Sequence, residues 1–314
     1  MKESKLAVVG CGHWGRNLVR NFAEIGVLKC VCDADIEVAK AIAKQFSVVV
    51  SGYDEILADP SITAVVVASP AEWHFDLCSK ALLAQKHVYV EKPITLDLSD
   101  AESLCDLAEK CSRKLMVGHL LLYHPAFIEL LARVRAGEIG QLRHIESTRF
   151  GFGKVRSHED ALWSFAPHDL SMVLRLTGLM PNRVKREDSF PLQKVPADIS
   201  TLHLEFHERL TAKVNVSWIH PYKDQKLIVT GSQGMLVFDD MKDWSEKLTL
   251  YHYDISSGVE LRKLREEKIK LEPSEPLRNE CQHFVDVING EKALMTPGED
   301  GRDVLSVLVQ SRKN

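Results

Sequence analysis

"KLAVVGCGHWGRNLVRNFAEIG", residues 5–26, decides the fold of this chain. It opens with a short apolar run, turns through three glycines and continues with helical periodicity, which is the order strand, tight turn, helix. Gly10, Gly12 and Gly15 show the spacing G-x-G-x-x-G. The first glycine permits the turn, the second lets backbone approach a pyrophosphate, and the third lets helix and strand pack closely. The helix N-terminus then offers free N–H groups to phosphates. The stretch predicts a dinucleotide site.

The next strand-like run, "LKCVCD", ends in Asp33, 18 residues after Gly15. A carboxylate at this offset accepts hydrogen bonds from ribose hydroxyls and repels a 2′-phosphate, so it favours NAD over NADP. The alternative is that Asp33 caps the following helix, "IEVAKAIAKQF", and both roles can coexist.

Val-rich runs then alternate with amphipathic helical patterns up to about residue 118. This alternation predicts a doubly wound parallel sheet, in which ligands collect at the carboxyl ends of the strands. Ser69-Pro70, Glu91-Lys92-Pro93 and Gly118-His119 follow such runs. Topology therefore places Lys92 on the ligand side, although a solvated charge at a turn remains the alternative.

After Pro125 a helical segment leads to runs with period-two alternation, such as "DISTLHLEF" and "TAKVNVSWI". They predict a large, mostly antiparallel sheet with one covered face. Helices are expected near 277–289 and 299–311. We therefore expect an α/β fold: a Rossmann domain over residues 1–120 and an α+β domain for substrate binding and oligomerisation over residues 121–314.

Composition excludes several classes of partner. The net charge is −4 with both signs interspersed, so no nucleic acid is expected. The longest apolar runs are too short to span a membrane, and no signal peptide is apparent at the N-terminus, so a cytoplasmic protein is expected.

The seven cysteines show no metal or disulfide spacing. His203 and His207 share one face of an expected strand, but without further ligands a solvated strand face is favoured and no metal is expected.

"LWSFAPHDLSMVLRLTG", residues 162–178, predicts a helix ending at Thr177-Gly178, with Pro167-His168-Asp169 in its first turn. A histidine there is kept neutral by the helix dipole, which suits a general base. The alternative is a capping or packing histidine.

The strings "GCGHWGRN", "EKP" and "PHD" occur in this order and at these separations in the glucose-fructose oxidoreductase, inositol dehydrogenase and rhizopine-catabolism (Gfo/Idh/MocA) family, which the chain resembles from end to end. Four further strings resemble the bacterial subgroup that acts on UDP-linked N-acetylated hexoses or their uronic acids. These are "YHPA" (123–126), "LWSFAPHD" (162–169), "VTGSQGMLVFDDM" (229–241) and "EPLRNECQHF" (275–284).

The resemblance implies that Lys92 lies beside the nicotinamide and the reacting carbinol, with a cis peptide to Pro93, and that His168 takes the hydroxyl proton. It implies a set of NAD-binding residues: Gly10, Gly12, His13, Trp14, Gly15, Asp33, Ser69, His74, Glu91 and Lys92. Candidate substrate contacts, for which an exposed surface position is an equal alternative, are His119, Tyr123, Lys154, Arg156 and Asp169.

One departure from the family pattern concerns the catalytic histidine. Many members carry Asp four residues before it, where this chain has Ser164, so Asp169 or another group has to replace that acidic partner.

The expected function is NAD-dependent oxidation of the 3-hydroxyl of a UDP-N-acetylated hexose or hexuronate to a 3-keto sugar. The alternatives are a dehydrogenase or ketoreductase for a free sugar or cyclitol, and a non-catalytic nucleotide-sensing homologue. The resemblance also implies a homodimer or homotetramer.

Overall fold

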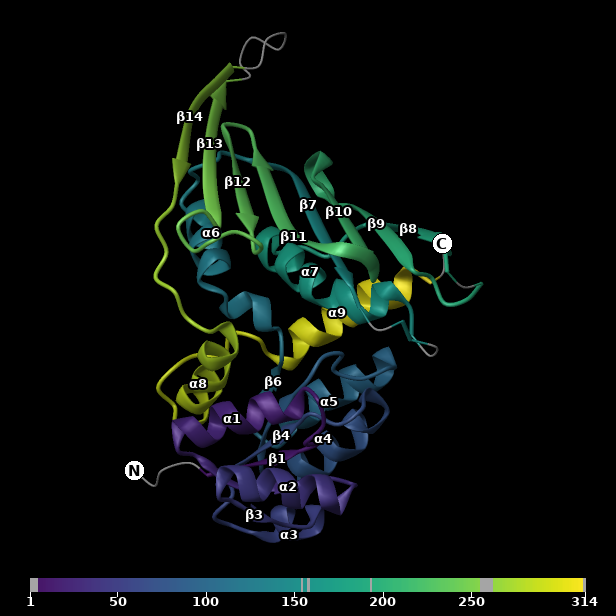
Figure 1. Cartoon of the computed structure of the whole chain (residues 1–314), viewed down its shortest axis with the longest axis vertical. Coiled ribbons are helices and arrows are strands. Elements are labelled where there is room, and N and C mark those ends of the chain that lie inside the picture. The colour runs from purple at the N-terminus through teal and green to yellow at the C-terminus, as the bar shows by residue number, and fades with distance from the viewer. Residues whose placement is uncertain (1–4, 154, 157–158, 193, 255–261, 313–314) are drawn as a thin grey trace. The chain divides into compact units, whose positions relative to one another are not determined.

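The computed structural model describes residues 5–153, 155–156, 159–192, 194–254 and 262–312 (Figure 1). It divides into two compact units. Unit 1 combines residues 1–120 with 275–305, and unit 2 combines residues 121–274 with 306–314. The first break falls where the sequence predicts it. The assignment of residues 275–305 to the second domain was wrong, because this segment returns to the first.

Unit 1 is built on a six-stranded sheet in the order β3-β2-β1-β4-β5-β6. Its strands are β1 (Leu6–Val9), β2 (Leu28–Cys32), β3 (Val49–Val50), β4 (Ala64–Val67), β5 (His87–Val90) and β6 (Leu115–Val117). All neighbouring pairs are parallel. The strands β1, β4 and β6 are completely buried apolar runs, as expected for a sheet covered on both faces. The predicted doubly wound sheet is confirmed.

The helices of unit 1 follow the strands. They are α1 (Gly15–Ile25), α2 (Ile36–Phe46), α3 (Tyr53–Ala58), α4 (His74–Leu83) and α5 (Leu98–Lys110), with a 3₁₀ turn η1 (Ala71–Trp73). Strand order reverses between β1 and β4, so right-handed crossovers place α1 and α2 on one face and the later helices on the other. The ends of β1 and β4 therefore form the switch point at which such sheets bind ligands.

The returning segment carries α8 (Pro276–Ile288) and leads into α9 (Gly298–Gln310), close to the predicted bounds. Phe284 of α8 lies edge-on to Tyr89 of β5 and to Phe22 of α1, with ring centroids 5.7 and 6.4 Å apart. Glu275 pairs with Arg20 of α1. These contacts join segments from opposite ends of the chain, so no local sequence pattern could reveal them.

Unit 2 is built on an eight-stranded sheet in the order β14-β13-β12-β11-β7-β10-β9-β8. The strands are β7 (Leu142–Phe152), β8 (Arg183–Ser189), β9 (Ile199–Glu205), β10 (Thr211–Ser217), β11 (Ile219–Gly231), β12 (Gly234–Asp239), β13 (Leu248–Asp254) and β14 (Arg262–Lys268). All pairs are antiparallel except β7 with β10, which confirms the predicted mostly antiparallel sheet. Strands β7, β8 and β14 were not predicted, because their sequences carry many charged residues.

The other elements of unit 2 are η2 (Leu120–Tyr123), α6 (Pro125–Arg135), α7 (Ala161–Thr177) and η3 (His207–Arg209). Helix α7 lies along one face of the sheet, where it packs on β7, β9 and β10 (Figure 1). The apolar residues Leu202, Leu204, Val214 and Val216 are buried on that covered face.

Candidate active site

The glycine turn after β1 is shaped by close contacts. Gly10 has a φ of +93°, and a Cβ there would lie 2.6 Å from the backbone of Ala68 and Ser69 at the end of β4. A Cβ on Gly15 would lie 1.9 Å from the Gly10 carbonyl oxygen. A Cβ on Gly12, in contrast, would meet no atom within 4 Å. Two glycines are thus required by packing, while the third borders open space in which a pyrophosphate fits.

Asp33 follows β2 and is half-buried. Its Oδ2 accepts a 2.6 Å hydrogen bond from the Cys11 backbone N–H, and its Oδ1 accepts one from Asp35 N–H at 2.9 Å. The N-cap of α2 is Asp35, whose Oδ1 accepts from Glu37 N–H at 2.9 Å. The alternative that Asp33 caps the helix was therefore wrong. Asp33 is instead held against the glycine turn, as an adenosine ribose ligand requires.

Glu91, directly after β5, is 8% exposed and accepts three hydrogen bonds. The donors are the Trp14 indole Nε1 at 2.6 Å, the Tyr89 hydroxyl at 3.2 Å and the Lys92 backbone N–H at 3.2 Å. Burial raises the pKa of Glu91, and the hydrogen bond from Trp14 and the charge of Lys92 oppose this rise. Lys92 is half-buried, and its peptide to Pro93 is cis, as expected.

His74 is 1% exposed at the start of α4. Its Nδ1 lies 2.8 Å from the Pro93 carbonyl oxygen and its Nε2 lies 2.9 Å from the Ser69 carbonyl oxygen. Burial lowers the pKa of His74. A neutral imidazole carries one N–H, so His74 donates to one of these two carbonyl oxygens and lies between the turns after β4 and β5. That His74 lines the cofactor cleft stays a prediction. Ser69 itself is half-buried at the edge.

The position of His168 corrects the sequence-based expectation. Helix α7 begins at Ala161, because the Asp160 side chain caps it by accepting from Trp163 N–H at 2.9 Å. Pro167 is therefore inside the helix and His168 lies at the end of its second turn, half-buried. The dipole of a helix N-terminus does not reach that far. The helix does end at Thr177, with Gly178 in the left-handed conformation, as predicted.

Asp169 was expected as a substrate contact or as the acidic partner of His168. It is completely buried, and its oxygens accept hydrogen bonds from Arg149 Nε at 2.8 Å, Arg149 Nη2 at 3.1 Å and Ser147 Oγ at 2.6 Å. Successive helical residues point about 100° apart, so Asp169 faces β7 while His168 does not. The prediction that Asp169 is the acidic partner of His168 was wrong, because its charge is committed to Arg149. That Asp169 contacts the substrate stays a prediction.

Another carboxylate, Glu159, lies beside Ser164. Ser164 stands one helical turn before His168, on the same face of α7, and its Oγ donates to Glu159 Oε1 at 2.7 Å. Glu159 also pairs with Arg156, which is exposed. Glu159 is therefore the carboxylate bonded to the residue at which the sequence departs from the expected family pattern.

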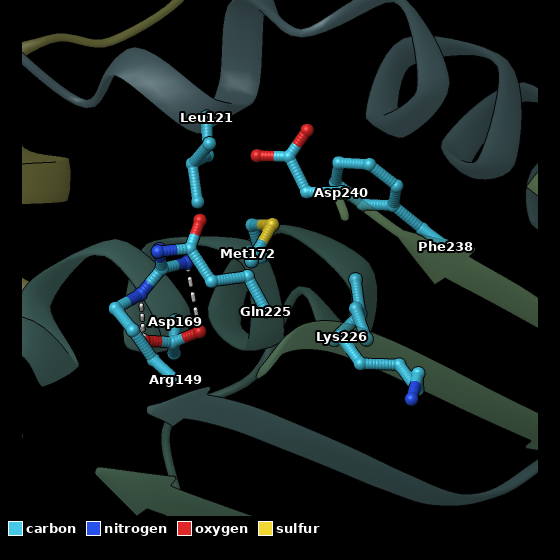
Figure 2. Close-up of a pocket in the computed structure, with 9 residues that line it drawn as sticks. Leu121, Arg149, Asp169, Met172, Gln225, Lys226, Phe238 and Asp240 are labelled. Atoms are coloured by element: carbon cyan, nitrogen blue, oxygen red, sulfur yellow. Dashed lines mark hydrogen bonds and ion pairs between the residues drawn. The ribbon is translucent and has the colours of Figure 1, made fainter. Parts of the chain in front are cut away.

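A pocket in unit 2 adjoins the Arg149–Asp169 pair (Figure 2). Its volume is about 10 Å³, room for about one water molecule and far less than the roughly 300–1,000 Å³ of complete ligand sites. The lining residues come from η2, α7 and three strands and are Leu121, Arg149, Asp169, Met172, Gln225, Lys226, Leu227, Phe238 and Asp240. Polar and charged side chains line it together with apolar ones.

Asp240, at the edge of this pocket, is held by a histidine and a lysine. His124 Nδ1 accepts from Ala126 N–H at 3.0 Å, so its Nε2 carries the proton and lies 3.4 Å from Asp240 Oδ1. Lys247 Nζ lies 2.7 Å from the same oxygen. Burial alone would raise the pKa of Asp240, but the hydrogen bonds from His124 and Lys247 outweigh it and lower the pKa. The carboxylate stays ionised.

The remaining predicted residues are dispersed. His13 and Trp14 lie exposed in the glycine turn. His119 in unit 1 and Tyr123 in unit 2 are buried, with exposed fractions of 1% and 2%. Lys154 lies outside the described residues.

His203 lies on β9, whereas His207 lies beyond the strand end in η3, so the two do not share a strand face. Within the described ranges, no cluster of three potential metal ligands occurs.

The sequence-based prediction did not include four polar residues that line this pocket: Arg149, Gln225, Lys226 and Asp240. Asp240 lies in the subgroup string "VTGSQGMLVFDDM", which was the available signal. Arg149 and Gln225 lie opposite each other on β7 and β11, and that register is not visible in the sequence.

Two family models match most of the chain. The model described as "Oxidoreductase family, NAD-binding Rossmann fold" matches residues 4–119, and the Gfo/Idh/MocA C-terminal domain matches residues 127–237. The chain belongs to the Gfo/Idh/MocA family. It is therefore an NAD-dependent oxidoreductase, and the glycine turn and Asp33 supply a site that fits this cofactor.

Two Gfo/Idh/MocA relatives bear on function. The UDP-N-acetylglucosamine 3-dehydrogenase of Acidithiobacillus ferrooxidans is 26% identical over 99% of this chain and 97% of its own length. A solved structure of that enzyme has a TM-score of 0.88 at 27% identity and covers 100% of this chain and 98% of that chain. The scyllo-inositol 2-dehydrogenase (NAD⁺) of Bacillus subtilis is 26% identical over 76% of this chain and 75% of its own length.

Among the described residues, no helix has both the length and the hydropathy that crossing a bilayer requires.

Proposed function

We propose that the chain oxidises the 3-hydroxyl of a UDP-N-acetylated hexose or hexuronate to a 3-keto nucleotide sugar. The supporting observation is the end-to-end similarity to UDP-N-acetylglucosamine 3-dehydrogenase, in sequence over 99% of the chain and in structure with a TM-score of 0.88. Both units take part in this similarity, so it is not confined to the dinucleotide-binding half of the chain. A 3-keto product is a substrate for amination, the class of reaction expected to follow.

Lys92 and His168 are the residues to which we assign the chemistry. NAD, when bound, accepts the hydride from the carbinol carbon. The Lys92 ammonium steadies the negative charge that develops on the carbinol oxygen, and the His168 imidazole accepts the hydroxyl proton. Gly10, Gly12 and Asp33 hold the adenosine diphosphate half of the cofactor. Ser69 and Glu91 line the cofactor cleft.

The polar groups beside the Arg149–Asp169 pair support a hydroxylated substrate. Arg149 is neutralised by Asp169, and Gln225 lies opposite Arg149 on β11. The Lys226 side chain points away from both (Figure 2), and its Nζ lies 3.2 Å from Asp224 and 3.5 Å from Asp239. A neutralised guanidinium and an amide donate hydrogen bonds to hydroxyl and carbonyl oxygens without a large surplus of charge. The free space beside them is that of about one water molecule, so we assign to them one hydroxyl or carbonyl group of the substrate.

A free sugar or cyclitol is the second candidate, favoured by the similarity to scyllo-inositol 2-dehydrogenase. That similarity covers only about three quarters of each chain. A non-catalytic sensor is disfavoured by the presence of both Lys92 and His168.

The test is a panel of UDP-hexoses, their uronates, free hexoses and inositols, followed at the NADH absorbance. We expect a signal from a UDP-N-acetylated sugar, with a 3-keto product identified by mass spectrometry. Product analysis is needed with each substrate, since a cofactor that never leaves the protein would hide turnover. A signal from a free polyol with none from any UDP-sugar would replace this proposal by the second candidate.

We also propose a homodimer or homotetramer in the cytoplasm. The face of the eight-stranded sheet opposite α7 is lined by half-exposed residues such as Thr201, His203 and Lys213, and a second copy of the chain is the expected partner. Light scattering coupled to size exclusion tests this; a monomer at micromolar concentration would contradict it.

A further inference from the structure

A buried carboxyl group in unit 1 has no role in the chemistry described above. Glu280 of α8 is 0% exposed, and neither of its oxygens meets the geometry of a hydrogen bond with any described donor. Its neighbours along the helix are Cys281 and, one turn later, Phe284, which are both completely buried. An ionised carboxylate without a partner is strongly unfavourable in such surroundings. The group is therefore neutral or has an unusual partner.

Tyr89 of β5 is the polar neighbour of Glu280. Tyr89 is 0% exposed, and its ring packs edge-on against Phe284, on the same face of α8 as Glu280. Its hydroxyl donates to Glu91 Oε1 at 3.2 Å. The same hydroxyl is close enough to Glu280 to lower the pKa of that carboxyl, although the pair falls short of a formed hydrogen bond. Tyr89 thus connects two buried carboxyl groups.

The two carboxyls differ in what surrounds them. Glu91 accepts from Trp14, Tyr89 and the Lys92 amide, whereas Glu280 accepts no such bond within the described residues. Burial raises the pKa of Glu280 well above its ordinary value, and the charge of Glu91 raises it further. The negative charge of Glu91 thus opposes ionisation of Glu280. The hydrogen bonds that Glu91 accepts favour its charged form, while Glu280 has none of them.

Gly118 leaves space for the Tyr89 hydroxyl and the Glu91 carboxylate. Gly118 follows β6, and a Cβ there would lie 2.8 Å from the Tyr89 hydroxyl oxygen and 3.0 Å from Glu91 Oε1. Any other residue at position 118 would displace one of these groups.

We propose that Glu280 is a positioning residue: as a neutral carboxylic acid it donates to the Tyr89 hydroxyl, which donates to Glu91, so that one fixed negative charge holds the Trp14 indole and the Lys92 amide. No proton is transferred in this chain of donors. Its effect is to lock the glycine turn, through Trp14, to the turn that carries Lys92. The inference depends on NAD binding and not on the identity of the sugar.

Infrared difference spectroscopy tests the protonation state without any substrate. At about pH 8, where an ordinary Glu is ionised, we expect the wild-type protein to show the carbonyl stretch of a buried carboxylic acid. The band should disappear in Glu280→Gln. The matched control is Asp286→Asn on the same helix. Asp286 is 8% exposed and is bonded to Gln282 and Lys292, which lower its pKa although burial opposes this, so the band should persist there. A wild-type spectrum without the band, or a band that survives in Glu280→Gln, would overturn the proposal.

Rescue by the conservative variant tests the positioning role. Glu280→Gln keeps an N–H donor for the Tyr89 hydroxyl, so its Kd for NAD should stay within about twofold of the wild type. Glu280→Leu has no donor, and we expect its Kd to rise about three- to tenfold, the equivalent of one neutral hydrogen bond. Thermal unfolding identifies a variant that fails to fold. Equal NAD affinity in the wild type and a folded Glu280→Leu, or equal losses in both variants, would refute a positioning role even if the proposed substrate is wrong.

Discussion

The indole nitrogen of Trp14 donates to Oε1 of Glu91 across 2.6 Å, and so joins the turn after β1 to the turn after β5. Trp14 lies inside the glycine motif, while Glu91 precedes Lys92. Because both turns lie at the carboxyl edge of one parallel sheet, a single hydrogen bond couples the phosphate-binding part of unit 1 to its proposed catalytic lysine.

Trp14→Phe removes this donor and keeps an aromatic ring. Hydrogen bonds to charged groups contribute about 1.5–3 kcal/mol, so we expect the free energy of unfolding to fall by about 1–2 kcal/mol and the Kd for NAD to rise. Urea denaturation and NAD titration measure the two effects. Trp73→Phe is the control, since Trp73 is 57% exposed in the same unit. Equal unfolding free energies and equal Kd values for NAD in the two variants would mean that the hydrogen bond to Glu91 contributes to neither.

Lys92→Ala should lower kcat by at least about 10²-fold, the usual effect of removing a group that stabilises a developing oxyanion. NAD should still bind, because the glycine turn and Asp33 remain. Steady-state kinetics and calorimetry separate the two steps. Lys80→Ala, which removes an exposed lysine paired with Asp76, provides the control. Full activity of Lys92→Ala would end the assignment.

Asp169→Asn should lower the free energy of unfolding. It leaves Arg149, whose side chain is only 11% exposed, without its counter-charge, and breaking a buried pair typically costs about 3–5 kcal/mol. We expect a large drop in the urea midpoint of unfolding. A variant with wild-type stability and a selective loss of kcat would instead restore Asp169 as the acidic partner of His168.

Ser164→Asp introduces the acid that many relatives carry four residues before the histidine. A carboxylate one turn away raises the pKa of an imidazole by favouring its charged form. Since the proposed base acts only when neutral, the acidic limb of kcat/KM should move to higher pH, by about one unit or more. Ser164→Asn adds no charge and should leave the limb in place. An unchanged profile in Ser164→Asp would place His168 outside the proton pathway.

The buried Glu280 predicts a pH-dependent stability. Its pKa is raised in the folded state, so above about pH 4.3, where the unfolded group ionises, the folded protein binds one more proton than the unfolded chain. Stability then falls as pH rises towards the folded pKa, by up to about 1.4 kcal/mol per unit. Glu280→Gln lacks this loss, so its advantage over the wild type should grow between about pH 5 and about pH 8.

Denaturation at several pH values measures that difference, and Asp286→Asn is again the control. The pKa of Asp286 is lowered, because its hydrogen bonds to Lys292 and Gln282 outweigh burial, so its stabilisation is lost only as pH falls towards and below its ordinary pKa. Its difference from the wild type should therefore stay constant over the same range. Parallel stability curves for wild type and Glu280→Gln would contradict the raised pKa.

Local chemistry predicted much of the site in unit 1. The glycine spacing, the Val-rich runs and the residues that follow them are short-range patterns, and parallel strand order brings their ends to one edge. Gly10, Asp33, Ser69 and Glu91 could therefore be assigned to that edge from their places in the sequence. His168 could not be placed as well, because Pro167 lies within a helix whose start is set by Asp160, and proline more often marks a first turn.

By itself the sequence determined the two kinds of sheet, the dinucleotide turn and the family, because each is written in contiguous residues. Tertiary structure alone decided that Asp169 belongs to Arg149, that Asp35 rather than Asp33 caps α2, and that α8 returns to unit 1 to bring Glu280 beside Tyr89. Each of these depends on which side chains meet in space and how far water is excluded, and burial and pairing between distant residues leave no periodic trace in the chain.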